Sequence, residues 1–303
     1  MNIKTPYIWK NWDFIAWDDA MDHNLTHSLH YWTWVFEWIR FYPTKNWPKI
    51  FRLEEHIDRL FYSAKVLELE ISFTKEEIMQ AHIELVAKSG VEAGYIRPIV
   101  YYWEWKMGLY PKWAKVEVVI SVWNWWKYLA DKAIDVKVSK YKRMHPESAD
   151  MNAKVSGWYY NNVLVSLEVH KEWFDEGLLL DYQWYIAEWP WENIFFIKDN
   201  TIYTPELWTI LPWITRATII QIAKDDFWLE VVEEKIHPDR LDEFQEAFFV
   251  WTAAEVTPIW SISYNDKKID FDSFNSGSLS NKIKDFYLNI VRWNNEKYSN
   301  WLS

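Results

Sequence analysis

Apolar side chains recur at helical spacing early in the chain. In FRLEEHIDRLFYSAKVL (51–67), Leu53, Ile57, Leu60 and Ala64 are separated by three or four residues. This spacing places them on one face of a helix, which can pack against a sheet or another helix. The pattern therefore predicts an amphipathic helix over 51–67.

A second helix is indicated by its end signals. TKEEIMQAHIELVAKSG (74–90) opens on Thr74, carries Glu77 three residues later and ends at Gly90. This order is typical of a capping box at the start and a glycine stop at the end. Other runs are rich in β-branched and aromatic residues or in turn formers. They predict strands at 95–103, 115–123, 136–143 and 230–236, hairpins at 7–17, 177–188 (turn Gln183-Trp184) and 193–205 (turn Asp199-Asn200), and helices at 157–172, 215–227 and 278–293.

The order of these elements indicates the domain organisation. Strands and helices are mixed without an internal repeat, which is typical of an α+β fold. A stretch rich in tryptophan and lysine (124–133) interrupts the pattern and reads as a connector. We expect an N-terminal domain over 1–123, the connector over 124–133 and a C-terminal domain over 134–303.

Composition excludes several classes of protein. The 303 residues are 50% apolar and 25% charged, and no run approaches the roughly eighteen apolar residues of a membrane helix. Cysteine is absent, which excludes disulfides and thiolate metal sites. The formal net charge is −11 with dispersed basic residues, which argues against phosphate-tracking nucleic-acid binding. The N-terminus lacks a signal-peptide pattern, so we expect a cytoplasmic enzyme.

One feature of the composition is abnormal. Tryptophan occurs 25 times, whereas glycine occurs only 6 times, far below the usual glycine share of about 7%. Turns with positive φ normally use glycine. A chain of this length needs more such turns than its glycines can supply.

Eight segments, spread over nearly the whole chain, carry a recognisable set of motifs. They are LTHSLHYWTWVFEWIR (25–40), FRLEEHIDRLFYSAK (51–65), YIRPIVYYWEWKMGLYP (95–111), VWNWWKYL (122–129), AKVSGWYYNN (153–162), YIAEWPWENIFFIKD (185–199), LPWITR (211–216) and WTAAEVTP (251–258). Together, and in family order, they resemble the branched-chain amino-acid aminotransferases, which are fold-type-IV pyridoxal-phosphate enzymes. The resemblance implies a small N-terminal α/β domain and a larger C-terminal domain with a barrel-like β core.

The departures from the family pattern are systematic, because tryptophan stands where the family has glycine. We hypothesise that UGA codons, read as glycine in the source organism, have been translated as tryptophan. The alternative is a genuinely tryptophan-rich chain that would carry strain in many turns. The 17 affected positions are tryptophans 12, 32, 34, 38, 47, 103, 105, 113, 126, 173, 184, 189, 191, 213, 228, 251 and 293.

The resemblance assigns the cofactor chemistry to three residues. Lys154 in AKVSG matches the lysine that bonds covalently to the aldehyde of pyridoxal 5′-phosphate and later moves the proton. Glu188 in AEW matches the carboxylate that faces the pyridine nitrogen, and Tyr159 matches the tyrosine that contacts the phenolic oxygen. Without the surrounding motifs, Lys154 would read as a surface lysine and Glu188 as a solvated turn acid.

The same resemblance implies an anchor for the cofactor phosphate. Arg59 in EEHIDRL matches the phosphate-binding arginine, since its planar fork of donors suits a phosphate. Ile214 and Thr215 in LPWITR, and Thr252 in WTAAE, would complete the anchor, with Ile214 contributing its backbone N–H. Taken alone, Arg59 would read as part of an ion pair on a helix surface.

The substrate residues implied by the resemblance are mostly aromatic. Arg97 would receive the distal carboxylate of glutamate, and the turn that begins Thr252-Ala253 would hold the α-carboxylate. Outside the family match, plain core packing would explain the aromatic residues as well. The apolar pocket would be lined by Tyr31, Phe36, Trp125 and Tyr128.

The function expected from the resemblance is transamination between branched-chain amino acids and 2-oxo acids, in a homodimer or dimer-based assembly. A D-amino-acid transaminase or an aminodeoxychorismate lyase of the same fold remains an alternative. If the tryptophans are real, a catalytically inactive binding protein is a third reading. His23, His27 and His30 lack an acidic partner for a metal helix, so we expect no metal site.

Overall fold

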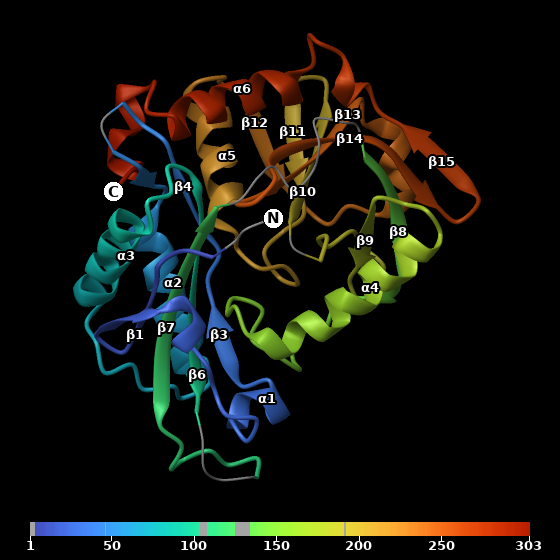
Figure 1. Cartoon of the computed structure of the whole chain (residues 1–303). Coiled ribbons are helices and arrows are strands. Elements are labelled where there is room, and N and C mark those ends of the chain that lie inside the picture. The colour runs from blue at the N-terminus through green and yellow to red at the C-terminus, as the bar shows by residue number, and fades with distance from the viewer. Residues whose placement is uncertain (1–3, 46, 104–107, 125–133, 191) are drawn as a thin grey trace. The chain divides into compact units, whose positions relative to one another are not determined.

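The computed structural model describes residues 4–45, 47–103, 108–124, 134–190 and 192–303 (Figure 1). These residues form two compact units. Unit 1 comprises Met1–Trp126, Ala153–Gly157 and Ile290–Ser303, and unit 2 comprises Lys127–Asn152 and Trp158–Asn289. Unit 1 thus includes two segments that a division at 124–133 assigns to the C-terminal part. Residues 125–133 of the expected connector lie outside the described residues.

In the described residues, unit 1 is built on a seven-stranded sheet whose strands differ in length. The strand order is β2-β1-β7-β6-β4-β5, and β3 pairs with β6. All pairings in this sheet are antiparallel. The strands are β1 (Tyr7–Lys10), β2 (Asp13–Ala16), β3 (Trp34–Phe36), β4 (Ile39–Tyr42), β5 (Lys49–Ile50), β6 (Gly94–Tyr102) and β7 (Val116–Asn124).

The helices of unit 1 confirm the two that were predicted from apolar spacing and from end signals. The helix α2 (Leu53–Val66) buries the predicted apolar face. The helix α3 (Lys75–Ser89) has the capping box formed by Thr74 and Glu77, and it ends at Gly90 with a φ of 70°. The helix α3 packs against β1 and β7, whereas α2 packs against α3 and β3. A short helix α1 (His27–Tyr31) precedes β3.

Unit 2 is built on an eight-stranded sheet with mixed pairing, again for the described residues. The order is β12-β11-β10-β13-β14-β8-β9, and β15 pairs with β14. The pairings β11–β12, β14–β8 and β8–β9 are parallel. The strands are β8 (Ile134–Lys142), β9 (Glu176–Leu180), β10 (Asn193–Lys198), β11 (Thr201–Thr204), β12 (Glu230–Glu233), β13 (Glu246–Trp251), β14 (Glu255–Tyr264) and β15 (Lys267–Asp270).

Three helices accompany this sheet. The helix α4 (Tyr159–Lys171) packs against β8 and β9, and α5 (Ile214–Asp225) packs against β12 and β13. The third, α6 (Leu279–Val291), is the predicted C-terminal helix. The core beneath them is rich in phenylalanine and isoleucine. Short 3₁₀ helices lie at Trp17–Asp19, Ser156–Trp158, Pro238–Glu243, Asp272–Phe274 and Glu296–Trp301.

Two of the three predicted hairpins form fully and the third only in part. The strands β1 and β2 pair on either side of the turn Asn11-Trp12. The strands β10 and β11 are joined at Asp199-Asn200, as predicted, and both residues have positive φ. The predicted hairpin at 177–188 has only one regular strand, because its second arm is a single bridge between Leu180 and Ile186. The N–H of Tyr185 donates there to the side chain of Asp181, which caps the turn.

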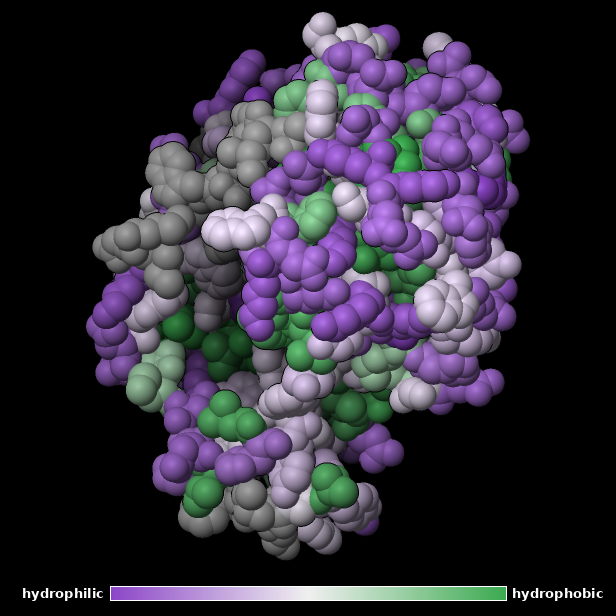
Figure 2. Space-filling model, turned by 90° about the vertical axis from the view of Figure 1, so that its right-hand side faces the viewer, coloured by the Kyte–Doolittle hydropathy of each residue, from purple (hydrophilic) through white to green (hydrophobic). Residues whose placement is uncertain are grey.

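The surface of the chain agrees with its composition. Hydrophilic side chains dominate the face seen in Figure 2, with apolar side chains scattered among them. Among the described residues, no helix is both long enough and apolar enough to cross a membrane. The described residues also contain no cluster of potential metal ligands.

Candidate active site

In unit 1, Lys154 is held between a strand and a helix. Its backbone N–H donates to Ser63 Oγ at 2.8 Å, and its carbonyl accepts from the N–H of Phe36 at 3.3 Å. Val155 forms a bridge with Val35 of β3. The side chain of Lys154 is fully buried, and its Nζ lies 4.7 Å from the ring centroid of Phe36. A lysine fixed this firmly at a buried position is unusual for a structural role.

Arg59 of α2 lies in a buried ionic network. Its Nε and Nη2 donate to the two carboxylate oxygens of Glu37 at 2.6 and 2.8 Å. His56, one turn earlier on α2, donates from Nδ1 to Glu37 at 2.8 Å. Sequence reasoning missed Glu37 and His56, because the strand-end acid and the helix meet only in the folded unit.

The network fixes the charge of Glu37. Burial alone would raise the pKa of Glu37, but the charge and hydrogen bonds of Arg59 and His56 outweigh burial and hold the pKa well below its usual range. Burial lowers the pKa of His56, against the opposing effect of Glu37. The arrangement is therefore an ionised carboxylate that clamps one edge of a guanidinium, beside a neutral imidazole.

Two of the predicted substrate residues meet in unit 1. Arg97 of β6 places its Cζ 4.8 Å from the ring centroid of Phe36 and 3.9 Å from that of Trp38. The ring of Phe36 thus lies close to both Lys154 Nζ and the guanidinium of Arg97. Tyr31 is on α1, where its hydroxyl accepts from the N–H of Gly108 at 3.1 Å.

The remaining predicted site residues fall in different parts of the chain. Trp125 and Tyr128 lie outside the described residues. In unit 2, Tyr159 is the first residue of α4 and is half-buried. Ile214 and Thr215 form the first turn of α5, and Thr252 and Ala253 directly follow β13; all four are buried. The helix α5 packs against β13 in unit 2.

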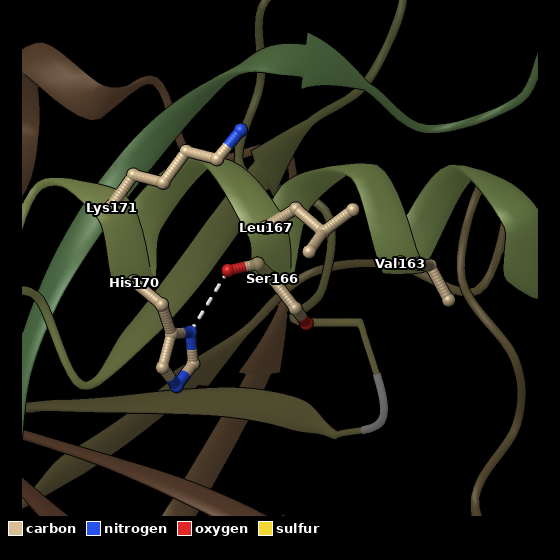
Figure 3. Close-up of a pocket in the computed structure, with 5 residues that line it drawn as sticks. All are labelled: Val163, Ser166, Leu167, His170 and Lys171. Atoms are coloured by element: carbon tan, nitrogen blue, oxygen red, sulfur yellow. Dashed lines mark hydrogen bonds between the residues drawn. The ribbon is translucent and has the colours of Figure 1, made fainter.

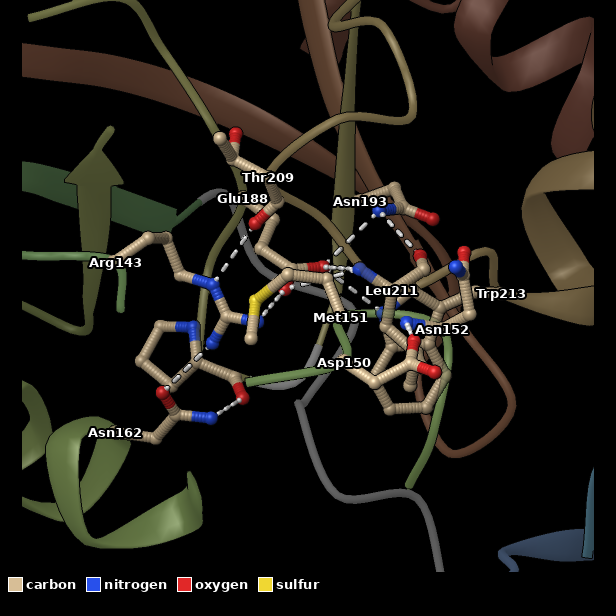
Figure 4. A network of polar contacts seen from close by, with 11 residues as sticks. Arg143, Asp150, Met151, Asn152, Asn162, Glu188, Asn193, Thr209, Leu211 and Trp213 are labelled. Atoms are coloured by element: carbon tan, nitrogen blue, oxygen red, sulfur yellow. Dashed lines mark hydrogen bonds and ion pairs between the residues drawn. The ribbon is translucent and has the colours of Figure 1, made fainter. Parts of the chain in front are cut away.

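The Glu188 carboxylate of unit 2 accepts hydrogen bonds from four groups (Figure 4). Arg143 donates from Nη2 to Oε1 at 2.7 Å. The backbone N–H of Leu211 lies 3.3 Å from both oxygens, and Asn193 Nδ2 lies 3.2 Å from Oε2. The indole N–H of Trp213 donates to Oε2 at 3.1 Å. Glu188 is therefore buried, ionically paired and surrounded by donors.

Arg143 is the charged member of this network that the sequence did not reveal. It follows the last residue of β8, is buried, and also donates to the carbonyl of Thr209 and to Asn162 at 3.3 Å each. A single basic residue at a strand end carries no motif. Its pairing with Glu188, 45 positions later, becomes visible only in the folded unit.

Comparison with known proteins decides the family. The sequence model described as "Amino-transferase class IV" matches residues 34–262. The branched-chain-amino-acid aminotransferase of Pseudomonas aeruginosa is 38% identical over 97% of this chain and 95% of its own length. The chain belongs to the class IV aminotransferases.

Solved structures agree with this assignment. The branched-chain amino acid aminotransferase of Escherichia coli superposes with a TM-score of 0.93 at 34% identity and 99% coverage of both chains. That of Thermobaculum terrenum, in its PLP-bound holo-form, gives a TM-score of 0.91 at 28% identity, over 99% of this chain and 98% of its own. The α+β fold of fold type IV predicted from the sequence is thereby confirmed.

Class IV aminotransferases use pyridoxal phosphate, so the residues of this chain can be tested against that group. A carboxylate has about four acceptor sites, and four donors already occupy Glu188. One of the donors is Trp213, a buried side chain on the loop that begins α5. As the chain is written, Glu188 has no acceptor left for a ring nitrogen, and the residues around it do not fit the cofactor.

Proposed function

We propose that this aminotransferase transfers an amino group between L-leucine, L-isoleucine or L-valine and 2-oxoglutarate. The observation that supports this substrate class best is the ring of Phe36, which lies close to both Lys154 Nζ and the guanidinium of Arg97. An aromatic ring suits a branched apolar side chain, whereas a guanidinium can receive the distal carboxylate of glutamate. When bound, the cofactor would supply an aldehyde and an electron-accepting ring.

The roles of the individual residues are part of the proposal. Lys154 would bind the cofactor aldehyde and move the proton, and Tyr159 would face the phenolic oxygen. Glu188 would face the ring nitrogen once glycine at 213 removes the indole donor. The phosphate would be held by Arg59, Ile214, Thr215 and Thr252. Substrate would be held by Tyr31, Phe36, Arg97, Trp125, Tyr128, Thr252 and Ala253.

The substrate class is tested with the native enzyme and a panel of amino acids in both enantiomers. We expect turnover of L-leucine, L-isoleucine and L-valine with 2-oxoglutarate. Turnover restricted to D-amino acids, or lyase activity on aminodeoxychorismate, would replace the proposal with one of the related activities of this fold.

The variant Arg97→Gln then tests the double use of the substrate site. We expect it to raise KM for glutamate and to leave KM for leucine almost unchanged, because only glutamate carries a second carboxylate. An equal loss for both substrates would contradict the role of Arg97.

We further propose a homodimer that works in the cytoplasm. Apolar residues of α4 are exposed at helical spacing: Tyr160, Val163 and Leu167 are 54%, 44% and 54% exposed. Val163 and Leu167 line a surface groove on α4 together with Ser166, His170 and Lys171 (Figure 3). We expect a second copy of the chain to cover this stripe. Light scattering of the native protein should give the mass of a dimer or a multiple of it, and a monomer would refute the assembly.

A further inference from the structure

Tryptophan is strongly enriched among the residues that hold positive φ. Thirteen described residues other than glycine lie in this region, and six of them are tryptophans. Four more are asparagine or aspartate, whose short polar side chains tolerate it. A bulky L-residue rarely adopts this conformation, which favours glycine. The six are tryptophans 12, 32, 173, 184, 228 and 293.

Four of the six tryptophans stand at or just beyond the C-terminal end of a helix. Trp32 ends α1, and tryptophans 173, 228 and 293 follow α4, α5 and α6. After α4, Trp173 N–H donates to the carbonyl of His170 and Phe174 N–H to that of Val169. At the end of α3, Gly90 likewise ends the helix in the left-handed conformation, with a φ of 70°. Glycine is the usual residue where a helix ends in the left-handed conformation.

The turn between β1 and β2 requires positive φ at two consecutive residues. Asn11 and Trp12 are its two central residues, with φ values of 47° and 85°. Positive φ at both positions is the signature of a type I′ hairpin turn, for which Asn-Gly is the preferred pair. The chain therefore has the first residue of that pair and a tryptophan in place of the second.

Burial does not explain why tryptophan would be used at these turns. Trp173 is 95% exposed and Trp228 is 86% exposed, so their indoles gain little from removal from water. Among the tryptophans that do not match family glycines, Trp9 and Trp301 are buried whereas Trp208 and Trp260 are exposed, so burial does not separate the two sets. Of the seven described tryptophans of this second kind, none has positive φ. Positive φ thus occurs only in the set of described tryptophans that match family glycines.

Trp213 lies at the candidate active site, and there the side chain rather than the backbone favours glycine. Its backbone is ordinary, with a φ of −71°, but its indole N–H uses one of the acceptor sites of Glu188. Glycine at 213 would remove this donor and open the space that the buried indole fills. The donors Arg143, Leu211 and Asn193 would remain, and the position on Oε2 that the indole N–H now uses would become available to a ring N–H.

We propose that the working enzyme carries glycine at positions 12, 32, 173, 184, 213, 228 and 293, and that glycine at 213 releases Glu188 for the cofactor ring. The part about 213 rests on the proposed role of Glu188. The part about the other six positions rests on backbone conformation alone. Tryptophan at 213 thus weakens the binding of the cofactor, and tryptophan at the six turns lowers the stability of the fold.

Three matched proteins test the proposal. The first has glycine at all 17 of the tryptophan positions that match family glycines. The second retains only Trp213 among them, and the third retains only Trp228. Each is titrated with pyridoxal phosphate, followed by absorbance, and each is melted without cofactor.

We expect the form that retains Trp213 to bind pyridoxal phosphate roughly 10–100-fold more weakly than the all-glycine form, the ratio that a hydrogen bond to a charged group provides. The form that retains Trp228 should bind as tightly as the all-glycine form but melt roughly 1–4 °C lower. Equal cofactor affinity with and without Trp213 overturns the part about position 213. An unchanged melting temperature with Trp228 overturns the part about the left-handed turns. If the all-glycine form binds cofactor but does not act on branched-chain amino acids, the proposed substrate fails and this inference stands.

Discussion

Trp173 and Trp228 allow the cost of tryptophan in a left-handed turn to be measured in isolation. Both belong to unit 2, both follow a helix, and both are almost fully exposed. The perturbation is the double substitution Trp173→Gly and Trp228→Gly. The left-handed conformation costs an L-residue about 1–2 kcal/mol, and the extra freedom of glycine in the unfolded chain returns about 0.5–1 kcal/mol of that.

The net gain is therefore about 0.5–1 kcal/mol for each substitution, or about 1–2 kcal/mol for the double variant, since distant sites add. A domain of this size is stable by only about 5–15 kcal/mol, so the gain is a measurable fraction of the whole. It should raise the melting temperature of unit 2 by roughly 2–4 °C for each kcal/mol.

The assay is urea unfolding of the protein without cofactor, followed by circular dichroism. The midpoint should rise while the slope of the transition stays unchanged, because the surface exposed on unfolding hardly differs. The matched control is the double substitution Trp173→Ala and Trp228→Ala, which removes the indoles but keeps a Cβ at each left-handed position. If the alanine variant gains as much as the glycine variant, backbone strain is not the cause and the reasoning is refuted.

Three further predictions concern buried charges. Glu37→Gln leaves Arg59 without its ionised partner and should destabilise unit 1 by roughly 3–5 kcal/mol at neutral pH. Because the folded pKa of Glu37 is lowered, this contribution to the wild-type stability begins to shrink as the pH falls below about 4.5 and is fully lost only below the folded pKa; the gap between the two proteins should therefore narrow steadily in urea melts from pH 5 to pH 3, and a gap that stays constant over this range would contradict it. Burial, and secondarily the charge of Asp175, raises the pKa of Glu176 to about 9. The contribution of Glu176 to stability is therefore full below about pH 4.5 and is lost as the pH rises to about 9. Glu176→Gln should remove this decline in urea melts between pH 5 and 9, and an identical decline in the variant would count against the raised pKa. In the all-glycine form, Lys154→Ala should abolish the absorbance band of covalently bound cofactor and all transamination, whereas cofactor that borohydride still fixes to the variant would show that another lysine binds the aldehyde.

Local chemistry explains what could be predicted about the fold. The helix α3 was predicted from Thr74, Glu77 and Gly90, and each of these acts through neighbours within one turn. The turn at Asp199-Asn200 was likewise predicted, because asparagine and aspartate tolerate positive φ. Such signals are complete within a few residues, so one sequence is enough to read them.

The parts that could not be predicted depend on contacts between distant residues. Arg143 reaches Glu188 only because β8 ends beside the loop before β10, and Glu37 meets Arg59 only because α2 lies along β3. The sequence does identify Lys154 and Glu188 through the family motifs, and the structure buries both. Their catalytic roles remain predictions, as do those of Tyr159 and Thr252.

The central claim is that the tryptophans in left-handed turns and at the cofactor carboxylate are glycines in the working enzyme. Peptide mass spectrometry of the protein isolated from its source organism tests this most directly. The peptides that span 171–175 and 211–216 decide it, because they contain Trp173 at a strained turn and Trp213 at Glu188. The account predicts glycine at both positions. Tryptophan at both positions in the native peptides would contradict it.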